Sequence, residues 1–176
     1  RRIGEVPLRV MESLPEEINV ALIMNTADLT PVDLLKLIAA EYGIFPASVK
    51  PVTAAAASLA SEGNPLNGER EKRSEWAGGH QVKSFTEGME FLYFPGCYLC
   101  YDPRLIKVAR ATAKILNAAG TDFGILGSKE SCCGESIRKT GNEELFRQLA
   151  KDNIKAFIDN GVKKILVSSP HCFHTF

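Results

Sequence analysis

The sequence has no excess charge of either sign, no long hydrophobic run and, over its first 96 residues, no cysteine. It carries 21 basic and 21 acidic residues, so its formal net charge is zero and its pI is about 7.0. This balance gives no electrostatic reason to bind nucleic acid or an anionic membrane surface. No apolar run reaches the roughly 18 residues that a membrane-spanning helix needs. We therefore expect neither nucleic-acid binding nor direct insertion into a membrane.

The cysteines are confined to the second half of the chain. Their clustering favours a metal or redox site over scattered structural residues. A disulfide framework is disfavoured because no signal-like apolar segment lies at the N-terminus, and because a chain that is 45% hydrophobic can build a core without covalent cross-links. A vicinal pair can also be two small buried side chains, but five cysteines in three groups favour a site. The five are Cys97, Cys100, Cys132, Cys133 and Cys172.

Each cysteine group directly follows a predicted strand, and a predicted helix lies between successive strands. The first helix has Asp102 as its N-cap and Gly120 as its C-cap, and the second begins at Asn142 and ends at Asn160. This β-α-β-α-β order predicts a small Rossmann-like α/β half-domain with parallel strands. Because parallel strands end at one edge of a sheet, the cysteines can form a single site there. The strands are predicted at residues 91–94, 122–126 and 164–167.

The spacing and the local text of these cysteines resemble a known family. Cys97 is followed, after residues 98–131, by Cys132-Cys133-Gly134, and a gap of similar length leads to Ser169-Pro170-His171-Cys172. The segments YFPGCYLCYDPR, SCCGE and PHCF, with GNPLNGEREKRSEWA upstream, are similar to the cysteine-rich CCG domain of heterodisulfide reductase-like iron–sulfur proteins. That family includes iron–sulfur subunits of glycolate and lactate oxidation systems and of sulfate-reducer membrane complexes. The resemblance covers residues 62–176.

The resemblance implies a cofactor and a set of ligands. In the family the site holds a non-cubane [4Fe–4S] cluster, so the matching ligands here are Cys97, Cys132, Cys133 and Cys172. Adjacent thiolates suit a polynuclear cluster, which offers each a different iron, and Gly134 can adopt a positive φ beside them. A structural zinc ion on the same four thiolates is the alternative, with no redox activity.

One family cysteine is replaced by Ser169, and an alcohol is a poor ligand for a soft iron–sulfur site. Either Ser169 binds weakly, or Cys100, three residues after Cys97, supplies the missing thiolate, or the site holds another metal centre. His171 and His174 are placed in a loop beside Cys172, as metal ligands or as partly buried polar residues. Nearby cations either offset cluster charge or are solvated side chains; these are Arg104, Lys129 and Arg138.

The remainder of the chain predicts a helical arm at residues 1–63, a connector at 64–87 and the cysteine-rich module at 88–176. Within the arm, a helix is predicted from Thr30 to Tyr42 and an alanine-rich one at residues 52–60. Family members usually carry further cysteine-rich segments, which predicts that this sequence is a fragment of a longer chain. The resemblance implies an electron-transfer module of an oxidoreductase complex. We expect it to be cytoplasmic and bound to other redox subunits, which can hold it at the inner face of a membrane.

Overall fold

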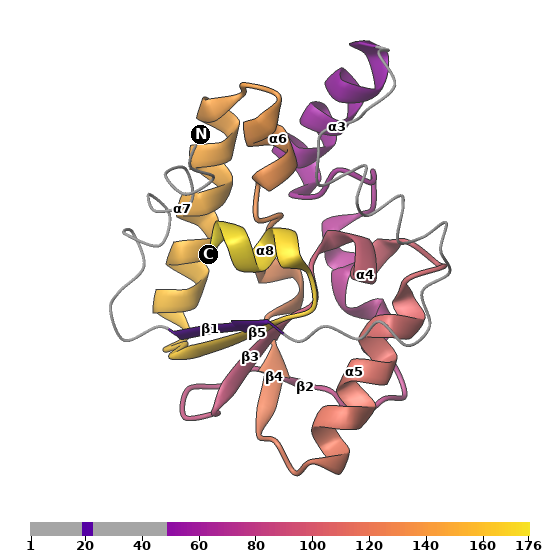
Figure 1. Cartoon of the computed structure of the whole chain (residues 1–176), viewed down its shortest axis with the longest axis vertical. Helices are drawn as coiled ribbons and strands as arrows, with labels where there is room; N and C mark the ends of the chain where they lie inside the picture. The colour runs from indigo at the N-terminus through magenta and orange to yellow at the C-terminus, as the bar shows by residue number, and fades with distance from the viewer. Residues whose placement is uncertain (1–18, 23–48) are drawn as a thin grey trace, which may run out of the picture.

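A parallel sheet of five strands lies at the centre of the described part of the fold (Figure 1). The computed structural model describes residues 19–22 and 49–176 of the chain. The strand order is β1-β5-β3-β4-β2 and every pairing is parallel. The three predicted strands are confirmed as the centre of this sheet: β3 (Phe91–Phe94), β4 (Phe123–Ile125) and β5 (Lys164–Val167). The short strands β1 (Asn19–Leu22) and β2 (Lys83–Ser84) form its two edges.

Helices flank the sheet on both sides. The two predicted crossover helices and the alanine-rich helix are confirmed, and Asn142 caps its helix as predicted, because its side chain accepts a hydrogen bond from the Leu145 amide at 3.1 Å. In chain order the longer helices are α3 (Val49–Glu62), α5 (Ile106–Ala118) and α7 (Glu143–Asp159). The shorter ones are η1 (Arg70–Ala77, 3₁₀), α4 (Cys97–Tyr101), η2 (Gly127–Lys129, 3₁₀), α6 (Glu135–Lys139) and α8 (Pro170–Thr175).

The start of α5 differs from the prediction. Asp102 is not the N-cap, because the helix begins at Ile106 after a turn in which the Leu105 and Ile106 amides both donate to the Asp102 carbonyl. The Asp102 side chain instead accepts from the Arg104 amide at 2.9 Å and pairs with the Arg104 guanidinium at 2.6 Å. At the other end of α5, Gly120 has φ of 69° and follows the C-cap Ala119.

The segments before residue 88 contribute to the folded body. Strand β1 lies within the predicted helical arm, where it pairs with β5. The predicted connector contains the 3₁₀ helix η1, which buries Arg73 and Trp76. Asn64 closes the turn before η1, since its side chain accepts from the Leu66 and Gly68 amides. The helix predicted from Thr30 to Tyr42 lies outside the described residues.

The strand alternation divides the core into two halves. Leu92 and Phe94 of β3 face a cluster that includes Phe157 of α7 and Phe176, whereas Tyr93 faces a cluster with Trp76. Phe94, Phe157 and Phe176 meet edge to face, with ring centroids 4.9 to 6.3 Å apart. In Figure 1, α7 and α5 correspondingly flank the sheet on opposite sides.

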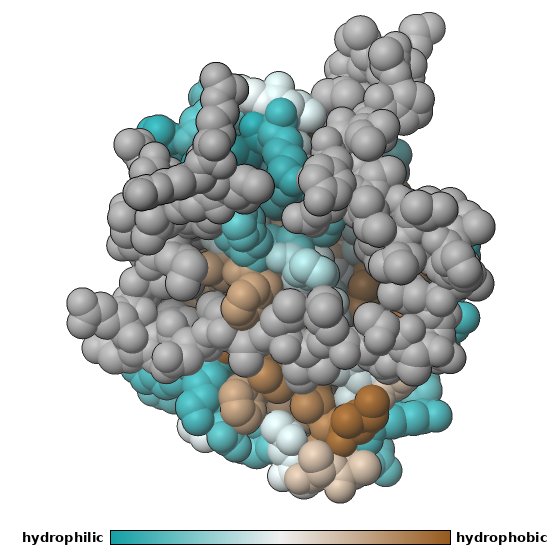
Figure 2. All heavy atoms as spheres, viewed as in Figure 1, coloured by the Kyte–Doolittle hydropathy of each residue, from teal (hydrophilic) through white to brown (hydrophobic). Residues whose placement is uncertain are grey.

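On the face seen in Figure 2, hydrophobic side chains gather in the lower part around the sheet, with hydrophilic ones toward the margins. Within residues 19–22 and 49–176, no helix combines the length and the apolar character needed to cross a bilayer.

Candidate metal centre

The loops that follow β3, β4 and β5 meet at one edge of the sheet. Phe94 pairs with Val167, which sets Gly96 beside Ser169 in the continuing backbones. Gly96 has φ of 84°, and a Cβ built on it would lie 3.2 Å from the Cys172 sulfur and 3.8 Å from the Ser169 Cβ. A side chain at position 96 would therefore crowd the cysteine that follows β5. This close approach brings residues from the two ends of the cysteine-rich module into one place.

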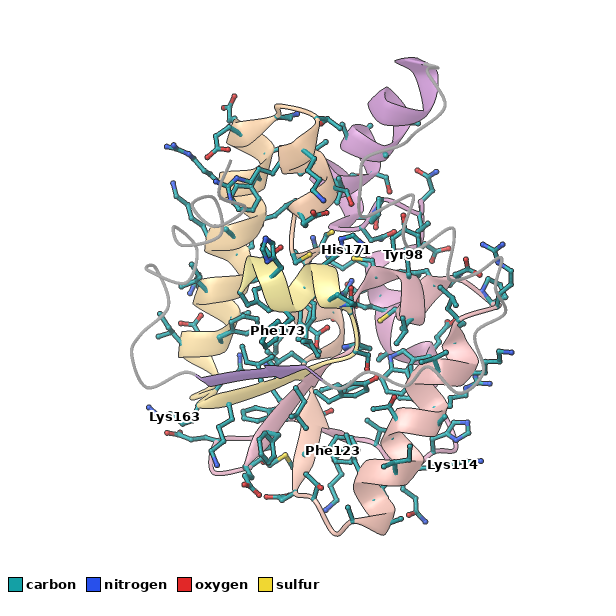
Figure 3. All side chains as sticks on the ribbon, in the orientation of Figure 1. Tyr98, Lys114, Phe123, Lys163, His171 and Phe173 are labelled. Atoms are coloured by element: carbon teal, nitrogen blue, oxygen red, sulfur yellow. The ribbon has the colours of Figure 1, made fainter. Side chains whose placement is uncertain are left out.

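Four cysteine side chains form a continuous buried series at this edge. Cys97 lies beside Cys132, Cys132 beside its neighbour Cys133, and Cys133 beside Cys172, close enough for each thiol to shift the pKa of the next. Ser169 lies next to Cys172 in the same way. All four thiols are free, and each of these cysteines is at most 8% exposed. In Figure 3 yellow sulfur atoms lie between α8 and α4, close to the labelled His171 and Tyr98.

The contacts between them give the four thiols unequal acidities. The neighbouring Cys132 thiol and the Arg73 guanidinium outweigh burial and lower the pKa of Cys97 to about 7. The pKa of Cys133 is also lowered, because the Cys132 and Cys172 thiols and the Glu135 amide favour its thiolate. The same contacts, together with burial, raise the pKa values of Cys132 and Cys172. Thiolate character, which metal binding requires, is therefore favoured on Cys97 and Cys133.

The loop that carries the vicinal pair, residues 127–134, is fixed by buried polar contacts. The Asn153 side chain of α7 accepts from the Ser131 amide at 2.8 Å and donates to the Ser131 and Cys132 carbonyls at 3.2 and 3.0 Å. The Cys132 amide donates to the Gly63 carbonyl at the end of α3 at 2.6 Å. Because these groups are buried, each bond also avoids the cost of an unpaired polar atom. The loop is therefore held from two helices that do not contain a cysteine.

Gly134 ends this loop with the positive φ that was predicted for it. Its φ is 85°, and a Cβ there would lie 2.8 Å from the Phe146 ring of α7. Its amide lies 3.4 Å from the Cys132 sulfur, to which it donates. Glycine at this position thus serves the turn, the close packing and a hydrogen bond to a sulfur.

A buried ion pair lies beside Cys97 and was not found by sequence reasoning. Arg73 of η1 is 1% exposed; its Nε is 3.2 Å from Glu130 Oε2 and its Nη1 donates to the Cys97 sulfur at 3.5 Å. Its Nη2 is buried and has no hydrogen-bond partner within the described part of the chain. The only sequence signal is weak: Trp76, one helical turn later, marks a buried side of an otherwise charged segment.

Cys100 is not part of the series. Its side chain lies in the other half of the core with Trp76 and Tyr93, and burial raises its pKa. The spacing of Cys97 and Cys100 suggested a chelating pair, but the structure does not bring Cys100 to the other three cysteines.

The two histidines named from the sequence lie in a helix, and the three cations named with them contact groups other than the cysteines. His171 and His174 lie in helix α8, not in the predicted loop, because Pro170 begins a helix directly after Ser169. The His171 Nδ1 lies 3.2 Å from Glu135 Oε2, and Glu135 also pairs with Lys139. Burial opposes ionisation of Glu135, yet these two partners prevail and lower its pKa. The cations named from the sequence have other partners: Asp102 for Arg104, Asn160 for Lys129, and Glu143 with the Phe146 ring for Arg138.

The residues suit a soft, negatively charged group. Thiolates are the ligands that iron–sulfur clusters and zinc share, and the buried Arg73 adds a cation whose Nη2 alone has no acceptor within the described residues. Across that same part of the chain, no group of three or more His, Cys, Asp or Glu side chains is placed so that it could hold a single metal ion.

The cysteine-rich segment is similar to a known protein family and to several named proteins. The family model described as "Cysteine-rich domain" (CCG) matches residues 91–176. The "Probable iron-sulfur-binding oxidoreductase FadF" of Bacillus subtilis is 38% identical over 128 residues, which is 68% of this chain and 18% of that protein. The "EtfAB:quinone oxidoreductase" of Syntrophomonas wolfei is 45% identical over 82 residues, 47% of this chain and 12% of that protein.

A third relative is a component of the dihydromethanophenazine:CoB–CoM heterodisulfide reductase of Methanosarcina mazei. It is 34% identical over 113 residues, 62% of this chain and 27% of that protein. The matched segments thus span between 12% and 27% of these three relatives' own lengths. No solved structure gives a significant match to the chain.

Proposed function

Residues 91–176 of this chain belong to the cysteine-rich CCG domain family, and from this premise we propose that the chain is an iron–sulfur electron-transfer module of a heterodisulfide-reductase-like oxidoreductase complex. The observation that carries the proposal is the buried series of four cysteines at the carboxyl edge of three parallel strands. Relatives named as an iron–sulfur-binding oxidoreductase and as part of a heterodisulfide reductase support the same interpretation.

The proposed ligands are Cys97, Cys132, Cys133 and Cys172, and the proposed cofactor is a [4Fe–4S] cluster of the non-cubane type. A bound iron–sulfur cluster supplies a centre that accepts and returns single electrons. The chain's own contribution is to keep four thiol groups together and away from water, on loops fixed by Asn153 and by the α3 end. Soft thiolates shielded from water are the surroundings that such a cluster requires.

Ser169 determines which of two roles we favour. It adjoins Cys172 at the place where the family has a further cysteine, and its hydroxyl is a poor iron ligand. A site that lacks one thiolate is less suited to attach and reduce a disulfide substrate at iron. We therefore propose electron relay as the role of the module, with other redox subunits as donor and acceptor. A cytoplasmic location, with membrane contact made through those subunits, belongs to the same proposal.

Reversible reduction tests this function. The full chain, purified without oxygen, is titrated with dithionite and then reoxidised while visible absorption and electron paramagnetic resonance are recorded. We expect broad visible absorption that bleaches on reduction and returns on oxidation, with a paramagnetic signal in one of the two states. A colourless protein that contains zinc and takes up no electrons would show that the site is a structural zinc module instead.

A further inference from the structure

The Arg73–Glu130 ion pair is unusual for its depth and its position. Both side chains are 1 to 2% exposed, and they join η1 to the vicinal-cysteine loop across 57 residues of sequence. Removing two charges from water is costly, and such a pair often stabilises a fold less than apolar residues of the same size would. The pair is therefore hard to explain by stability alone.

The guanidinium contacts the first of the four proposed ligands. One face lies against the Phe94 ring, with Cζ 5.5 Å from the centroid, while Nε contacts Glu130 and Nη1 contacts the Cys97 sulfur. The remaining donor, Nη2, is buried without an acceptor in the described residues. A buried donor without a partner carries a free-energy cost. The Tyr101 hydroxyl also lies near this guanidinium, so the contact with Cys97 is the one that ties Arg73 to the proposed ligands.

We propose that Arg73 is a positioning residue of the cluster site, whose charge and hydrogen bond to the Cys97 sulfur raise the reduction potential, and that Glu130 holds it in place and offsets part of its effect. This inference rests on the proposed function and goes beyond the cysteine ligands. Addition of one electron makes a cysteine-ligated cluster more negative, so a cation beside a ligand sulfur favours the reduced state. Arginine suits the position because it stays charged when buried.

Opposite charge changes within this one pair provide the test. The full chain carrying Arg73→Gln or Glu130→Gln is purified without oxygen, and its midpoint potential is measured by titration with dithionite as electron donor. Arg73→Gln removes the positive charge and should lower the potential by at least a tenfold change in the reduction equilibrium, about 59 mV for one electron. Glu130→Gln removes the negative charge that offsets Arg73 and should therefore raise the potential. The amide oxygen of glutamine can still accept a hydrogen bond where the carboxylate contacts Arg73 and the Leu126 amide, so the local structure is kept.

The loop offers a matched control. Arg70 also reaches the vicinal-cysteine loop, but its Nη1 donates to Ser131 Oγ at 3.2 Å and to the Ser128 carbonyl at 3.3 Å, and it is only half-buried. Arg70→Gln removes the same charge from the same loop and should shift the potential by much less than tenfold. Equal shifts in Arg73→Gln and Arg70→Gln would overturn the proposal.

A purely structural role predicts a different pattern. Both substitutions break one ion pair, so both would then destabilise the chain and move the potential in the same direction or not at all, which would overturn the proposal. If Arg73→Gln does not fold because Glu130 is left as an unpaired buried charge, the double variant Arg73→Gln/Glu130→Gln is compared with Glu130→Gln. The double variant should have the lower potential. Failure of the proposed function is distinguishable, because the unmodified chain would then contain no cluster to titrate.

Discussion

At the scale of single residues, the site depends on which side chains share the buried series. Cys97, Cys132, Cys133 and Cys172 lie together in one half of the core, whereas Cys100 packs in the other half with Trp76. The sequence left Ser169 and Cys100 as two candidates for the missing ligand. The structure separates them, because Ser169 adjoins Cys172 and Cys100 does not. The following two substitutions use that separation.

Cys97 and Cys100 should respond differently to alanine. Cys97→Ala removes a proposed ligand and should abolish cluster binding. Cys100→Ala should leave the iron content unchanged and lower the free energy of unfolding by roughly 1 to 2 kcal/mol, as for a small core truncation. Iron per chain and chemical denaturation of both variants check this. Loss of iron in Cys100→Ala would mean that Cys100 moves into the site and replaces the missing thiolate.

Ser169→Cys should add a soft ligand next to Cys172 and slow the loss of iron to a chelator. Ser168→Cys is the matched control, because the Ser168 hydroxyl is 2.7 Å from the Tyr93 hydroxyl, which lies in the half of the core that does not contain the four cysteines. Iron release is followed spectroscopically for both variants and the unmodified chain. Equal protection by both substitutions would show that the position of the new thiol is irrelevant.

At the scale of elements, the site is built from loops and from helices of five or six residues that follow the strands. Each proposed ligand lies in such a helix or just before it: Cys97 at the first residue of α4, the vicinal pair before α6, and Cys172 in α8. Longer helices fix these loops from outside, as Asn153 of α7 does. The loop geometry should therefore be sensitive to substitutions that change no ligand.

Gly134→Ala tests that sensitivity. The substitution puts a Cβ at φ of 85° and 2.8 Å from the Phe146 ring, so it should destabilise the chain by about 2 to 4 kcal/mol through strain and overpacking together. Gly141 has nearly the same φ, 86°, but a Cβ there meets nothing within 4 Å. Gly141→Ala should cost only the strain, about 1 kcal/mol. Urea denaturation compares them, and equal losses would refute a packing role for Gly134.

Much of this arrangement could be predicted from the sequence, for identifiable reasons. Strands β3, β4 and β5 are short apolar runs bounded by turn residues, and α7 has a capping Asn142, so their positions were recovered. The meeting of the cysteines follows from the parallel strand order. The role of these cysteines as ligands stays a prediction.

The missed features are those that depend on contacts distant in sequence or on very short elements. Helices α4, α6 and α8 span too few residues to show a helical period, so α8 was taken for a loop. Arg73 stands among other charged residues in η1, and nothing local distinguishes it from Arg70 or Lys72. Only the fold brings it to Glu130 and Cys97.

At the scale of the whole molecule, the four cysteines bring together loops that the hydrogen bonds of the sheet do not join. The loops after β3, β4 and β5 meet at the site, and the end of α3 joins them through the Gly63 carbonyl. A group bound by all four thiols would hold these parts together in the folded state only. Binding to the folded state alone raises its stability.

Removal of the cluster should therefore lower the temperature of unfolding. Metal binding in thiolate sites can contribute about 10 kcal/mol to folding, so treatment with a chelator under reducing conditions should cause a large drop. The same treatment should leave Cys97→Ala unaffected, since that variant is expected to hold no cluster. Differential scanning calorimetry of the two proteins before and after treatment measures the effect. An unmodified chain with the same unfolding temperature in both states would contradict a cross-linking site.

The central claim is that four cysteines from three loops jointly hold an iron–sulfur cluster. Its most direct test is the content of iron, inorganic sulfide and zinc per chain in the protein purified without oxygen. We expect several iron atoms and comparable inorganic sulfide in each folded chain, with both lost together in Cys97→Ala and Cys172→Ala. A single zinc ion per chain with no inorganic sulfide would contradict the claim.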